Sequence, residues 1–367
     1  MNGKPIEGEK RVFMTGNEAI CWAALAAGAD IMYGYPITPQ NEIMHSWSRM
    51  APEYNKSFLQ TEDELSAGFC CIGGILGGKK AFTGTAGPGT VLMQEPLSMS
   101  EMMRLPMVTI ICQRGGPSTA TVIYSQQETT LTCFGGNGEG YRIVYSTAGQ
   151  QDLFDYTIKA FNTAWKYRFP TFILGDGYQS KMREPLTIYD PELRGIQMAD
   201  TTVLMGGEGI PGQEREPIHL RNTYNMEDEL YQVVKEMDEE YKRIAPAIIE
   251  YQAYENHDAE LIIISHGIVS RAVKGAVELL RQKGFRAGYF RPITLRPFPG
   301  EELRKAVSKA NLILVAESAM GQLANLVKKE LYGLAVPITG YFRPGEGITV
   351  EEIVEEAQIK MGWKEAI

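Results

Sequence analysis

Short apolar runs and amphipathic stretches alternate along the first half of the chain. Runs typical of buried β-strands occupy residues 30–35, 57–62, 79–86, 106–114, 142–146 and 171–176. Apolar residues at helical spacing occupy residues 15–29, 63–78, 90–104 and 150–168. Thr15 or Asn17 would cap the first of these helices. The alternation predicts an α/β domain with a doubly wound parallel sheet, whose two faces are covered by helices.

A connecting region follows this pattern. Residues 205–217 are rich in turn formers, and residues 226–243 predict one amphipathic helix. Its apolar stripe consists of Met226, Leu230, Val233, Val234, Met237 and Tyr241. The opposite face is acidic, which is typical of a solvated face. We therefore expect a connector helix that packs on a neighbouring element.

A second α/β pattern, long enough for a domain of its own, completes the chain. Its strands are expected at residues 259–267, 286–292, 310–317 and 335–343. Its helices are expected at residues 268–284, 300–310 and 320–333. The predicted organisation is a first domain over residues 8–185, a connector over 186–257, and a second domain with a C-terminal helix over 258–367.

Composition narrows the class of protein. Of the 367 residues, 44% are apolar and 22% are charged, which is typical of a soluble globular protein. The net charge of −9 disfavours nucleic-acid binding, which requires a basic face. No apolar run of membrane-spanning length occurs, and the first residues lack the apolar core of a signal peptide. We therefore predict a cytoplasmic protein that binds neither nucleic acid nor membrane.

The cysteines and histidines indicate no metal centre. No CxxC pair occurs, and four of the five cysteines lie in apolar segments, so we expect reduced, structural thiols at Cys21, Cys70, Cys71, Cys112 and Cys133. The four histidines show no metal-ligand spacing. The chain alone is therefore predicted to hold neither zinc nor an iron–sulfur cluster.

Four conspicuous segments follow successive strands of the first predicted domain. They read "YPITP" (35–39), "EDE" (62–64), "GTAGPG" (84–89) and "RGGPST" (114–119). Ligands of parallel sheets bind beyond the carboxyl ends of the strands. These segments therefore predict one shared pocket.

The first and third segments have conformations suited to a ligand site. Pro36 and Pro39 fix the backbone around Thr38 and so orient its hydroxyl group, although a stiff turn without a ligand is the alternative. The glycines of "GTAGPG" leave the backbone open to close approach by a ligand, but glycines are common in such loops.

The other two segments carry charge. Glu64 would enter a helix of small residues packed tightly on the sheet, which predicts a desolvated carboxyl group with a raised pKa that can share a proton with a ring nitrogen. Glu62 and Asp63 are more typical of helix-dipole complements. Arg114 can bind a substrate carboxylate through two parallel hydrogen bonds. The alternative for Arg114 is an ion pair with Glu62 or Asp63.

Together, "TGNEA", "YPITPQNE", "QTEDELSAG", "TAGPG", "RGGPST" and, in the second unit, "VAESAMGQLANLV" resemble the alpha subunit of the 2-oxoacid:ferredoxin oxidoreductases. The similarity is greatest to the separate-subunit enzymes for 2-oxoglutarate and branched-chain 2-oxoacids. The resemblance implies a thiamine-diphosphate pyrimidine-binding domain followed by a transketolase C-terminal-like domain. It also implies oxidative decarboxylation of a 2-oxoacid with coenzyme A to acyl-CoA, CO₂ and reduced ferredoxin, or the reverse reaction.

Residue roles follow from this resemblance. Glu64 would hydrogen-bond the pyrimidine ring nitrogen, Arg114 would bind the 2-oxoacid carboxylate, and Thr38 would contact the substrate near its reacting carbonyl group. The expected cofactor-binding residues are Glu64, Pro36, Ile37, Gly87 and Gly89.

The resemblance further implies an active site divided between chains. A beta subunit would carry the diphosphate, Mg²⁺ and a [4Fe-4S] cluster, and gamma and ferredoxin-like delta subunits would complete the enzyme, with ferredoxin as electron acceptor. The residues agree with this division. A "GDG" occurs at residues 175–177, but the next asparagine is Asn222, which is too distant for the usual Mg²⁺ motif. We interpret this "GDG" as a turn after a strand.

One stretch departs from the family pattern. After "RGGPST" the family often continues with a Gly- or Pro-rich loop, whereas residues 120–140 read "ATVIYSQQETTLTCFGGNGEG". The identity of the 2-oxoacid therefore stays open, with Tyr124, Gln126 and Gln127 as candidate pocket residues. Two alternatives remain: a complete thiamine-dependent, transketolase-like lyase, and a non-catalytic scaffold subunit.

Overall fold

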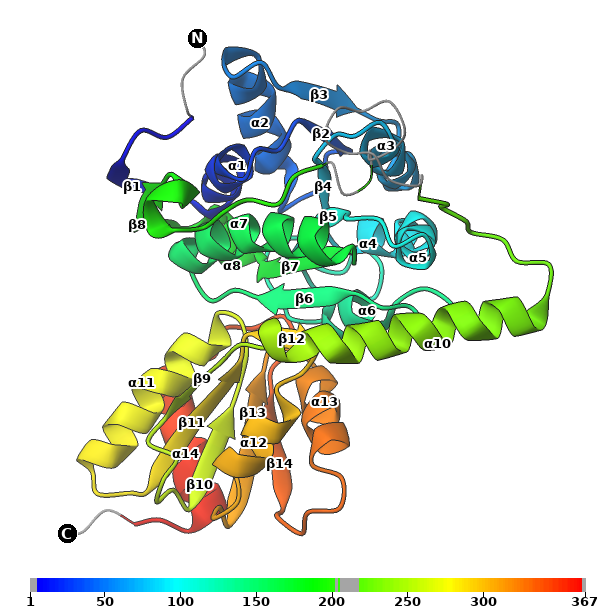
Figure 1. Cartoon of the computed structure of the whole chain (residues 1–367). Coiled ribbons are helices and arrows are strands. Elements are labelled where there is room, and N and C mark those ends of the chain that lie inside the picture. The colour runs from blue at the N-terminus through cyan, green and yellow to red at the C-terminus, as the bar shows by residue number, and fades with distance from the viewer. Residues whose placement is uncertain (1–4, 202–203, 205–217, 365–367) are drawn as a thin grey trace.

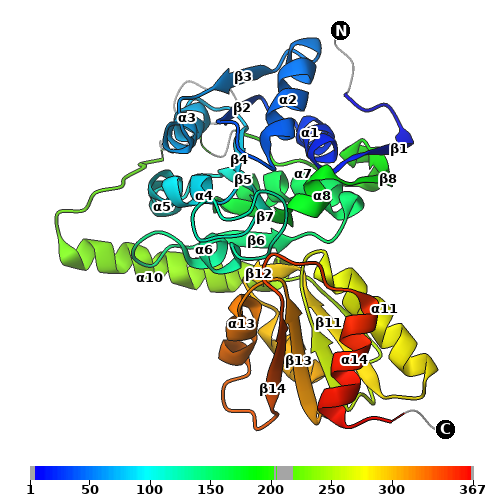
Figure 2. The same ribbon diagram turned by 180° about the vertical axis from the view of Figure 1, so that it is seen from behind.

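The computed structural model describes residues 5–201, 204 and 218–364 (Figure 1). Within these residues the strands form a seven-stranded sheet, a five-stranded sheet and a two-stranded ribbon. The two larger sheets belong to two α/β units that lie one above the other (Figures 1 and 2). The predicted turn-rich segment at residues 205–217 lies outside the described residues.

The seven-stranded sheet has the order β12-β6-β7-β5-β4-β2-β3. Its strands are β2 (Ile31–Gly34), β3 (Ser57–Gln60), β4 (Ala81–Thr85), β5 (Val108–Gln113), β6 (Ile143–Ser146), β7 (Thr171–Asp176) and β12 (Thr294–Arg296). All neighbours run parallel except the edge pair β12 and β6. After β3 the chain returns past β2 to form β4, so the carboxyl ends of β2 and β4 flank a topological switch point.

Helices cover both faces of this sheet, which confirms the doubly wound prediction. The helices of the first unit are α1 (Gly16–Ala26), α2 (Asn41–Glu53), α3 (Glu64–Leu76), α4 (Pro88–Leu92), α5 (Gln94–Met102), α6 (Thr129–Phe134), α7 (Gln150–Tyr167) and α8 (Gly177–Lys181). The apolar faces of α1, α2 and α7 share one core with the sheet. Helices α3 and α5 pack in the core on the other face. As predicted, Thr15 caps α1, in a capping box with Glu18.

A two-stranded antiparallel ribbon covers the outer side of α1 and α7. It pairs β1 (Glu9–Thr15) with β8 (Arg183–Tyr189). Leu186 and Ile188 of β8 pack in a small core with Ala19 of α1 and Phe154 of α7. A short 3₁₀ helix, η1 (Pro191–Arg194), follows the ribbon.

The second unit contains the five-stranded sheet, in the order β14-β13-β10-β11-β9. Its strands are β9 (Tyr251–Tyr254), β10 (Leu261–Ile264), β11 (Ala287–Pro292), β13 (Leu312–Glu317) and β14 (Ile338–Phe342). Its helices are α11 (Val269–Gln282), α12 (Gly300–Ala306), α13 (Gln322–Glu330) and α14 (Val350–Met361). Helices α11 and α14 cover one face and α13 lies on the other (Figure 2). The edge strand β9 is antiparallel to β11, whereas the other pairs are parallel.

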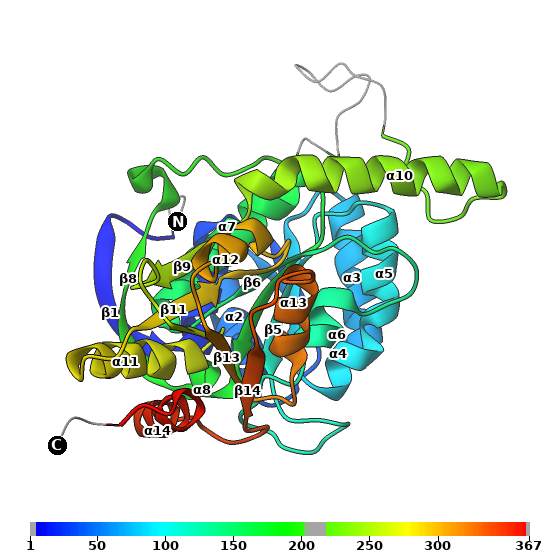
Figure 3. The ribbon, with the colours of Figure 1, turned by 90° about the horizontal axis from the view of Figure 1, so that it is seen from below.

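The connector helix is α10 (Glu227–Ile244), which runs along one side of the molecule where the two units meet (Figures 1 and 3). A 3₁₀ turn, η2 (Ala245–Ala247), ends it. Met237 and Tyr241 are buried as predicted, and the Tyr241 hydroxyl group donates to the Arg142 carbonyl oxygen at 2.8 Å. In the N-terminal half, Met226 and Leu230 remain 60% and 42% exposed. The prediction of a packed apolar face therefore holds for the C-terminal half only.

Candidate active site

The segments that follow β2, β3, β4 and β5 meet at the switch point of the first sheet. Arg114, after β5, donates from Nη1 to the carbonyl oxygen of Thr38, after β2, at 2.9 Å. A Cβ atom at Gly87, after β4, would lie 2.5 Å from Nε of Arg114. A Cβ atom at Gly89 would lie 2.6 Å from Cδ of Glu64, which begins α3 after β3. The structure therefore brings the four predicted segments together.

Arg114 is a buried cation with donor capacity to spare. Only 4% of the residue is exposed, and its Nε is buried without a hydrogen-bond partner among the described residues. Burial lowers the pKa of the guanidinium group, and the nearby carboxyl groups of Glu128 and Glu64 oppose this effect. An unsatisfied buried donor is costly, so this side chain is suited to an anionic ligand.

The alternative ion pair of Arg114 with Glu62 or Asp63 is not formed in the described part of the chain. Asp63 instead caps α3, since its Oδ1 accepts a hydrogen bond from the backbone N–H of Ser66 at 2.7 Å. These hydrogen bonds lower the pKa of Asp63. Glu62 is exposed to solvent. Both residues therefore behave as helix-terminus residues, as their positions indicated.

Glu64 is one buried acid of the site. It is 4% exposed, and desolvation raises the pKa of its carboxyl group, with a smaller effect of Asp63 in the same direction. The charge of Arg114 acts against this rise. A raised pKa favours the protonated carboxyl group, which can donate its proton in a hydrogen bond.

The two glycines of "GTAGPG" make room for the charged side chains. Gly87 has φ of 55°, a conformation that disfavours other residues, and lies against Arg114. Gly89 lies against Glu64 and Thr85. The sequence suggested that these glycines let a ligand approach. In the structure they are already required by the side chains around them.

The "YPITP" corner contributes a backbone carbonyl group to the site. Thr38 and Ile37 are half-buried, whereas Pro36 is exposed. The bond between Thr38 and Pro39 is cis. The carbonyl group of Thr38 orients Arg114. The sequence had suggested a role for the Thr38 hydroxyl group and not for this carbonyl group.

Glu128 is a site residue that sequence reasoning missed. Its Oε1 accepts hydrogen bonds from the Gly87 N–H (2.8 Å) and the Thr90 hydroxyl group (2.6 Å), and its Oε2 accepts from the Arg114 N–H (2.9 Å). Burial raises the pKa of Glu128, and these hydrogen bonds oppose the rise. The sequence does contain a feature that could have indicated this residue: Glu128 is the sole charged residue between Arg114 and Glu139.

The candidate pocket residues of the 120–140 stretch face other neighbours. Gln126 is fully buried, and its side-chain amide donates to the carbonyl oxygen of His266 in the second unit at 2.8 Å. Tyr124 is buried against Tyr178, with ring centroids 4.6 Å apart. The Oε1 atom of Gln127 accepts from the Gly116 N–H at 3.3 Å. These side chains therefore hold the loop in place.

The "GDG" at residues 175–177 starts a helix, so its interpretation as a turn is wrong. Oδ1 of Asp176 caps α8 by accepting hydrogen bonds from the N–H groups of Tyr178 (2.9 Å) and Gln179 (3.1 Å). Burial raises the pKa of Asp176 to about 7. The carboxyl group is thus already used by the protein backbone.

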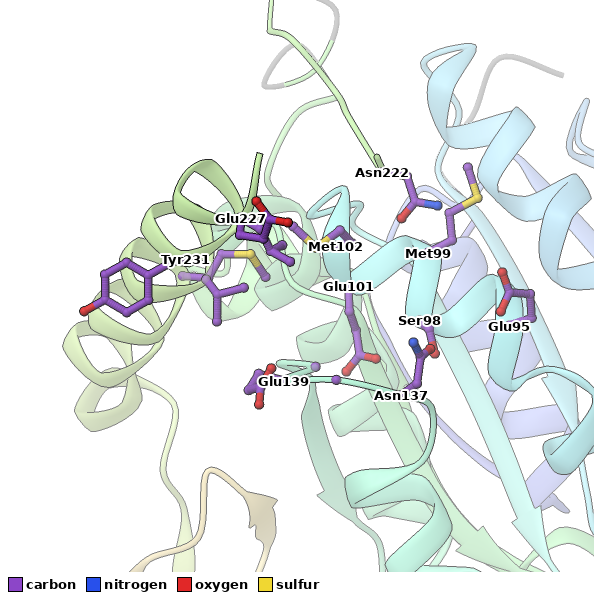
Figure 4. A pocket seen from close by; sticks show the side chains of 15 residues that line it. Glu95, Ser98, Met99, Glu101, Met102, Asn137, Glu139, Asn222, Glu227 and Tyr231 are labelled. Carbon is purple, nitrogen blue, oxygen red and sulfur yellow. The ribbon is translucent and has the colours of Figure 1, made fainter. Parts of the chain in front are cut away.

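A cavity of about 650 Å³ lies between α5 and α10, away from this site (Figure 4). Its walls combine carboxyl groups with apolar side chains, and Asn222 lies at its edge. Its lining residues include Glu95, Met99, Glu101, Met102, Glu139, Glu227, Leu230 and Met237. None of the predicted site residues lines it.

Two further features bear on the sequence predictions. Among the described residues, Glu255, His257 and Asp258 form the one group of potential metal ligands within 4.8 Å of one another. Asp258 is already paired with Arg281 at 2.8 Å, so we assign no metal to this group. The five cysteines are free thiols. None of the described helices combines the length and apolar character needed to cross a membrane.

Exposed apolar side chains occur on the same segments that form the site. They belong to the "YPITP" corner, to α3 and α4, and to the loop after Arg114. The residues are Tyr35, Phe69, Val91, Leu92, Val122 and Ile123, each 36% to 59% exposed. Exposed apolar groups that gather in one patch are typical of a surface that another protein covers.

Comparisons with protein families and curated proteins agree with one another. Residues 22–253 match the family described as pyruvate flavodoxin/ferredoxin oxidoreductase, thiamine diphosphate-binding. Residues 259–353 match pyruvate:ferredoxin oxidoreductase core domain II. The chain is 34% identical to 2-oxoglutarate synthase subunit KorA of Methanocaldococcus jannaschii, over 85% of this chain and 89% of that protein. It is 33% identical to ketoisovalerate oxidoreductase subunit VorB of Methanothermobacter marburgensis, over 85% and 88%.

Solved structures share the fold. A 2-oxoglutarate:ferredoxin oxidoreductase from Magnetococcus marinus, solved with 2-oxoglutarate, coenzyme A and succinyl-CoA bound, superposes with a TM-score of 0.84 at 24% identity. The match covers 96% of this chain but 65% of the solved chain, so this chain spans about two thirds of that length. A split-gene transketolase, described as an inactive beta4 tetramer, matches with a TM-score of 0.57 at 13% identity. The predicted transketolase-like α/β fold is therefore confirmed.

Proposed function

Since the chain belongs to the family of 2-oxoacid:ferredoxin oxidoreductase alpha subunits, we propose that its candidate site binds the aminopyrimidine of thiamine diphosphate and the carboxylate of a 2-oxoacid. The observation that carries the proposal is the presence of a buried carboxyl group, Glu64, and a buried guanidinium group, Arg114, at the switch point of one sheet. The two side chains interact electrostatically. One is an acid and the other is a cation.

The residues of the site fit the cofactor and the substrate. Burial raises the pKa of Glu64, so its carboxyl group can share a proton with a ring nitrogen of the aminopyrimidine. The unpartnered Nε of Arg114 can donate to a carboxylate oxygen. Thr38, Ile37 and Pro36 would border the substrate and the ring. Thiamine diphosphate, when bound, supplies the electron sink that decarboxylation of a 2-oxoacid requires.

The proposed site is shared with a partner chain. The segments that form it, α3, α4 and the loop after Arg114, carry exposed apolar side chains, which supports docking of another subunit there. Asp176 is already a helix cap, which supports a diphosphate and Mg²⁺ site outside this chain. We propose that a beta subunit supplies these groups and a [4Fe-4S] cluster. We further propose that gamma and delta subunits complete the enzyme, and that ferredoxin and coenzyme A take part in its reaction.

The substrate belongs to the 2-oxoacids. Relatives named for 2-oxoglutarate and for ketoisovalerate are 34% and 33% identical to this chain, so both acids are candidates. The reaction we propose is coenzyme A-dependent oxidative decarboxylation, or its reverse. The domain limits of 8–185, 186–257 and 258–367 remain part of the proposal. So does a cytoplasmic location, which five free thiols support because thiols persist in reducing compartments.

Copurification tests this function directly. The chain is expressed with its neighbouring subunits, and reduction of a viologen dye is measured with 2-oxoglutarate or 2-oxoisovalerate, with and without coenzyme A. We expect turnover by the complex only, dependent on the 2-oxoacid and on coenzyme A. Decarboxylation by the lone chain with added thiamine diphosphate and Mg²⁺ would instead identify a complete lyase. A complex whose turnover is unchanged by Glu64→Gln and Arg114→Ala would identify a scaffold.

A further inference from the structure

Glu128 joins two loops of the candidate site by hydrogen bonds from one buried side chain. One carboxylate oxygen accepts from the Gly87 N–H and the Thr90 hydroxyl group, and the other accepts from the Arg114 N–H. The residue is 5% exposed. The two oxygens of Glu128 therefore bridge the loop after β4 and the start of the loop after β5.

The residues around Glu128 are held by the second unit. The Gln126 side chain makes two hydrogen bonds with the second unit. It donates to the His266 carbonyl oxygen (2.8 Å) and accepts from the Ser318 N–H (2.9 Å). The backbone N–H of Gln126 also donates to the Ser318 carbonyl oxygen at 2.9 Å. His266 follows β10 and Ser318 follows β13, so the carboxyl end of the second sheet faces this loop.

Gln322, the first residue of α13, adds a second connection on the other side of Glu128. Its side-chain amide donates to the Gln127 carbonyl oxygen, and its Oε1 accepts from the Thr130 N–H, both at 2.7 Å. Residues 126–130 are thus bound to the second unit on both sides of the buried carboxylate. Movement of the second unit would be transmitted to Glu128 through these bonds.

We infer that Glu128 is a positioning residue for the substrate-binding Arg114, and that the second α/β unit fixes its place through Gln126 and Gln322. The inference rests on the proposed role of Arg114 in binding the 2-oxoacid carboxylate. Glu128 hydrogen-bonds the backbone N–H of Arg114 and its charge acts on the Arg114 guanidinium group, so it would act on the substrate through that residue.

The chemistry of the three hydrogen bonds makes Glu128 sensitive to an isosteric change. All three partners are donors, and a carboxylate offers acceptors on both oxygens. Glutamine keeps the shape but turns one oxygen into an NH₂ donor. That donor would face either the Arg114 N–H or the Gly87 and Thr90 donors, and the loops would have to separate.

The test is Glu128→Gln in the complex purified with its partner subunits. We expect KM for 2-oxoglutarate or 2-oxoisovalerate, whichever is used, to rise about 10-fold, as loss of one hydrogen bond to a buried charged group implies. KM for coenzyme A should stay within about twofold, since Glu128 acts through Arg114. In an Arg114→Ala background, Glu128→Gln should change the 2-oxoacid KM by less than about twofold, because the two changes act on one interaction.

Two further variants separate positioning from general destabilisation. Gln322→Ala removes one connection to the second unit without touching the buried carboxylate, and should raise the 2-oxoacid KM about two- to fivefold. This variant also tests the inference if Glu128→Gln fails to fold. Its matched control is Asn325→Ala, exposed on the same helix, and the control for Glu128→Gln is Glu236→Gln, exposed on α10. Both controls should leave KM unchanged.

The outcomes distinguish this inference from the function it rests on. Normal 2-oxoacid KM in Glu128→Gln or Gln322→Ala, in a wild-type complex that turns over, would overturn the positioning role alone. The positioning role would also be overturned if the rise in KM in the double variant equalled the product of the rises in Glu128→Gln and Arg114→Ala. That result would indicate independent structural damage. Absence of any 2-oxoacid turnover by the wild-type complex would overturn the proposed function and the inference together.

Discussion

Gly89 leaves the space that the carboxyl group of Glu64 occupies. A Cβ atom at position 89 would lie 2.6 Å from Cδ of Glu64 and closer than 3.0 Å to the Thr85 hydroxyl oxygen. Glu64 begins α3 and Gly89 lies in the first turn of α4, so the buried acid is enclosed by two helix N-termini. The glycine-rich loop therefore makes room for the Glu64 side chain, whether or not a ligand is bound.

The first prediction concerns this contact. Gly89→Ala should lower the free energy of unfolding by about 1–3 kcal/mol, because the added methyl group must displace Glu64 or Thr85. Chemical denaturation measures the change. Gly73→Ala is the matched control: nothing lies within 4 Å of a Cβ at this exposed position in α3, so it should be neutral or stabilising by about 0.5–1 kcal/mol. Equal effects of the two changes would contradict the enclosed position of Glu64.

The second prediction concerns the proton of Glu64. Glu64→Gln in the complex should lower kcat about 100-fold while cofactor affinity changes less, since the role proposed for the carboxyl group lies in proton transfer more than in binding. Steady-state turnover and titration of thiamine diphosphate measure the two quantities. Glu62→Gln, two residues earlier and exposed, should leave both unchanged. Loss of cofactor binding with a normal residual kcat would argue against the proton-transfer role.

The third prediction concerns the proposed binding of the 2-oxoacid carboxylate by Arg114. Arg114→Ala should lower kcat/KM for the 2-oxoacid about 10- to 100-fold, through loss of about 1.5–3 kcal/mol of charge-assisted hydrogen bonding. Arg114→Lys keeps the charge but loses the planar pair of donors, so it should restore only part of the activity. An unchanged kcat/KM in Arg114→Ala would exclude Arg114 as the carboxylate-binding residue.

The fold was predictable from the chain because its strong periodic patterns are local. Strands such as β5 and β7 have apolar centres, and α3 and α7 show helical spacing between turn residues. Helix α2 was not predicted although Ile43, Met44, Trp47 and Ala51 form its buried stripe, because the prolines before it favour a turn. The edge strand β12 was missed because three residues carry no periodicity, and its pairing with β6 is a tertiary event.

The sequence identified site residues only where they lie near the carboxyl ends of predicted strands. Arg114 directly follows β5 and Glu64 begins α3, the helix after β3, and the topology of a parallel sheet places such residues together. Glu128 follows no strand, and its neighbours Gln126 and Gln127 suggested a pocket lining. What fixes Glu128 is the position of three donors from other segments, which no periodicity encodes.

The fourth prediction concerns pH and Asp176. Burial raises the pKa of this carboxyl group from its ordinary value of 3.8 to about 7. Between these two values the folded state binds more protons than the unfolded state, so the free energy of unfolding should fall as pH rises from about 4 to about 7. Asp176→Asn keeps the helix-capping oxygen and lacks the titration. Its stability relative to the wild type should therefore increase with pH, as measured by denaturation at pH 4, 5.5 and 7. A difference independent of pH would contradict the raised pKa.

The fifth prediction concerns the ion pair beneath the cavity between α5 and α10. Arg142 is fully buried and binds Glu101 of α5 through two hydrogen bonds, Nε to Oε1 at 2.7 Å and Nη2 to Oε2 at 2.6 Å. The same guanidinium group donates to the carbonyl oxygens of Thr132 and Gly135. It therefore ties α6 and the loop after it to α5.

Arg142→Met should lower the free energy of unfolding by about 3–5 kcal/mol, because it leaves the carboxylate of Glu101 buried without its cation. The double change Arg142→Met with Glu101→Leu removes both charges and should recover much of the loss, since two apolar side chains need no counter-charge. Denaturation of the single and double variants measures both effects. A single-variant loss below about 1 kcal/mol, or a double variant no more stable than Arg142→Met, would show that the uncompensated charge of Glu101 is not the cause.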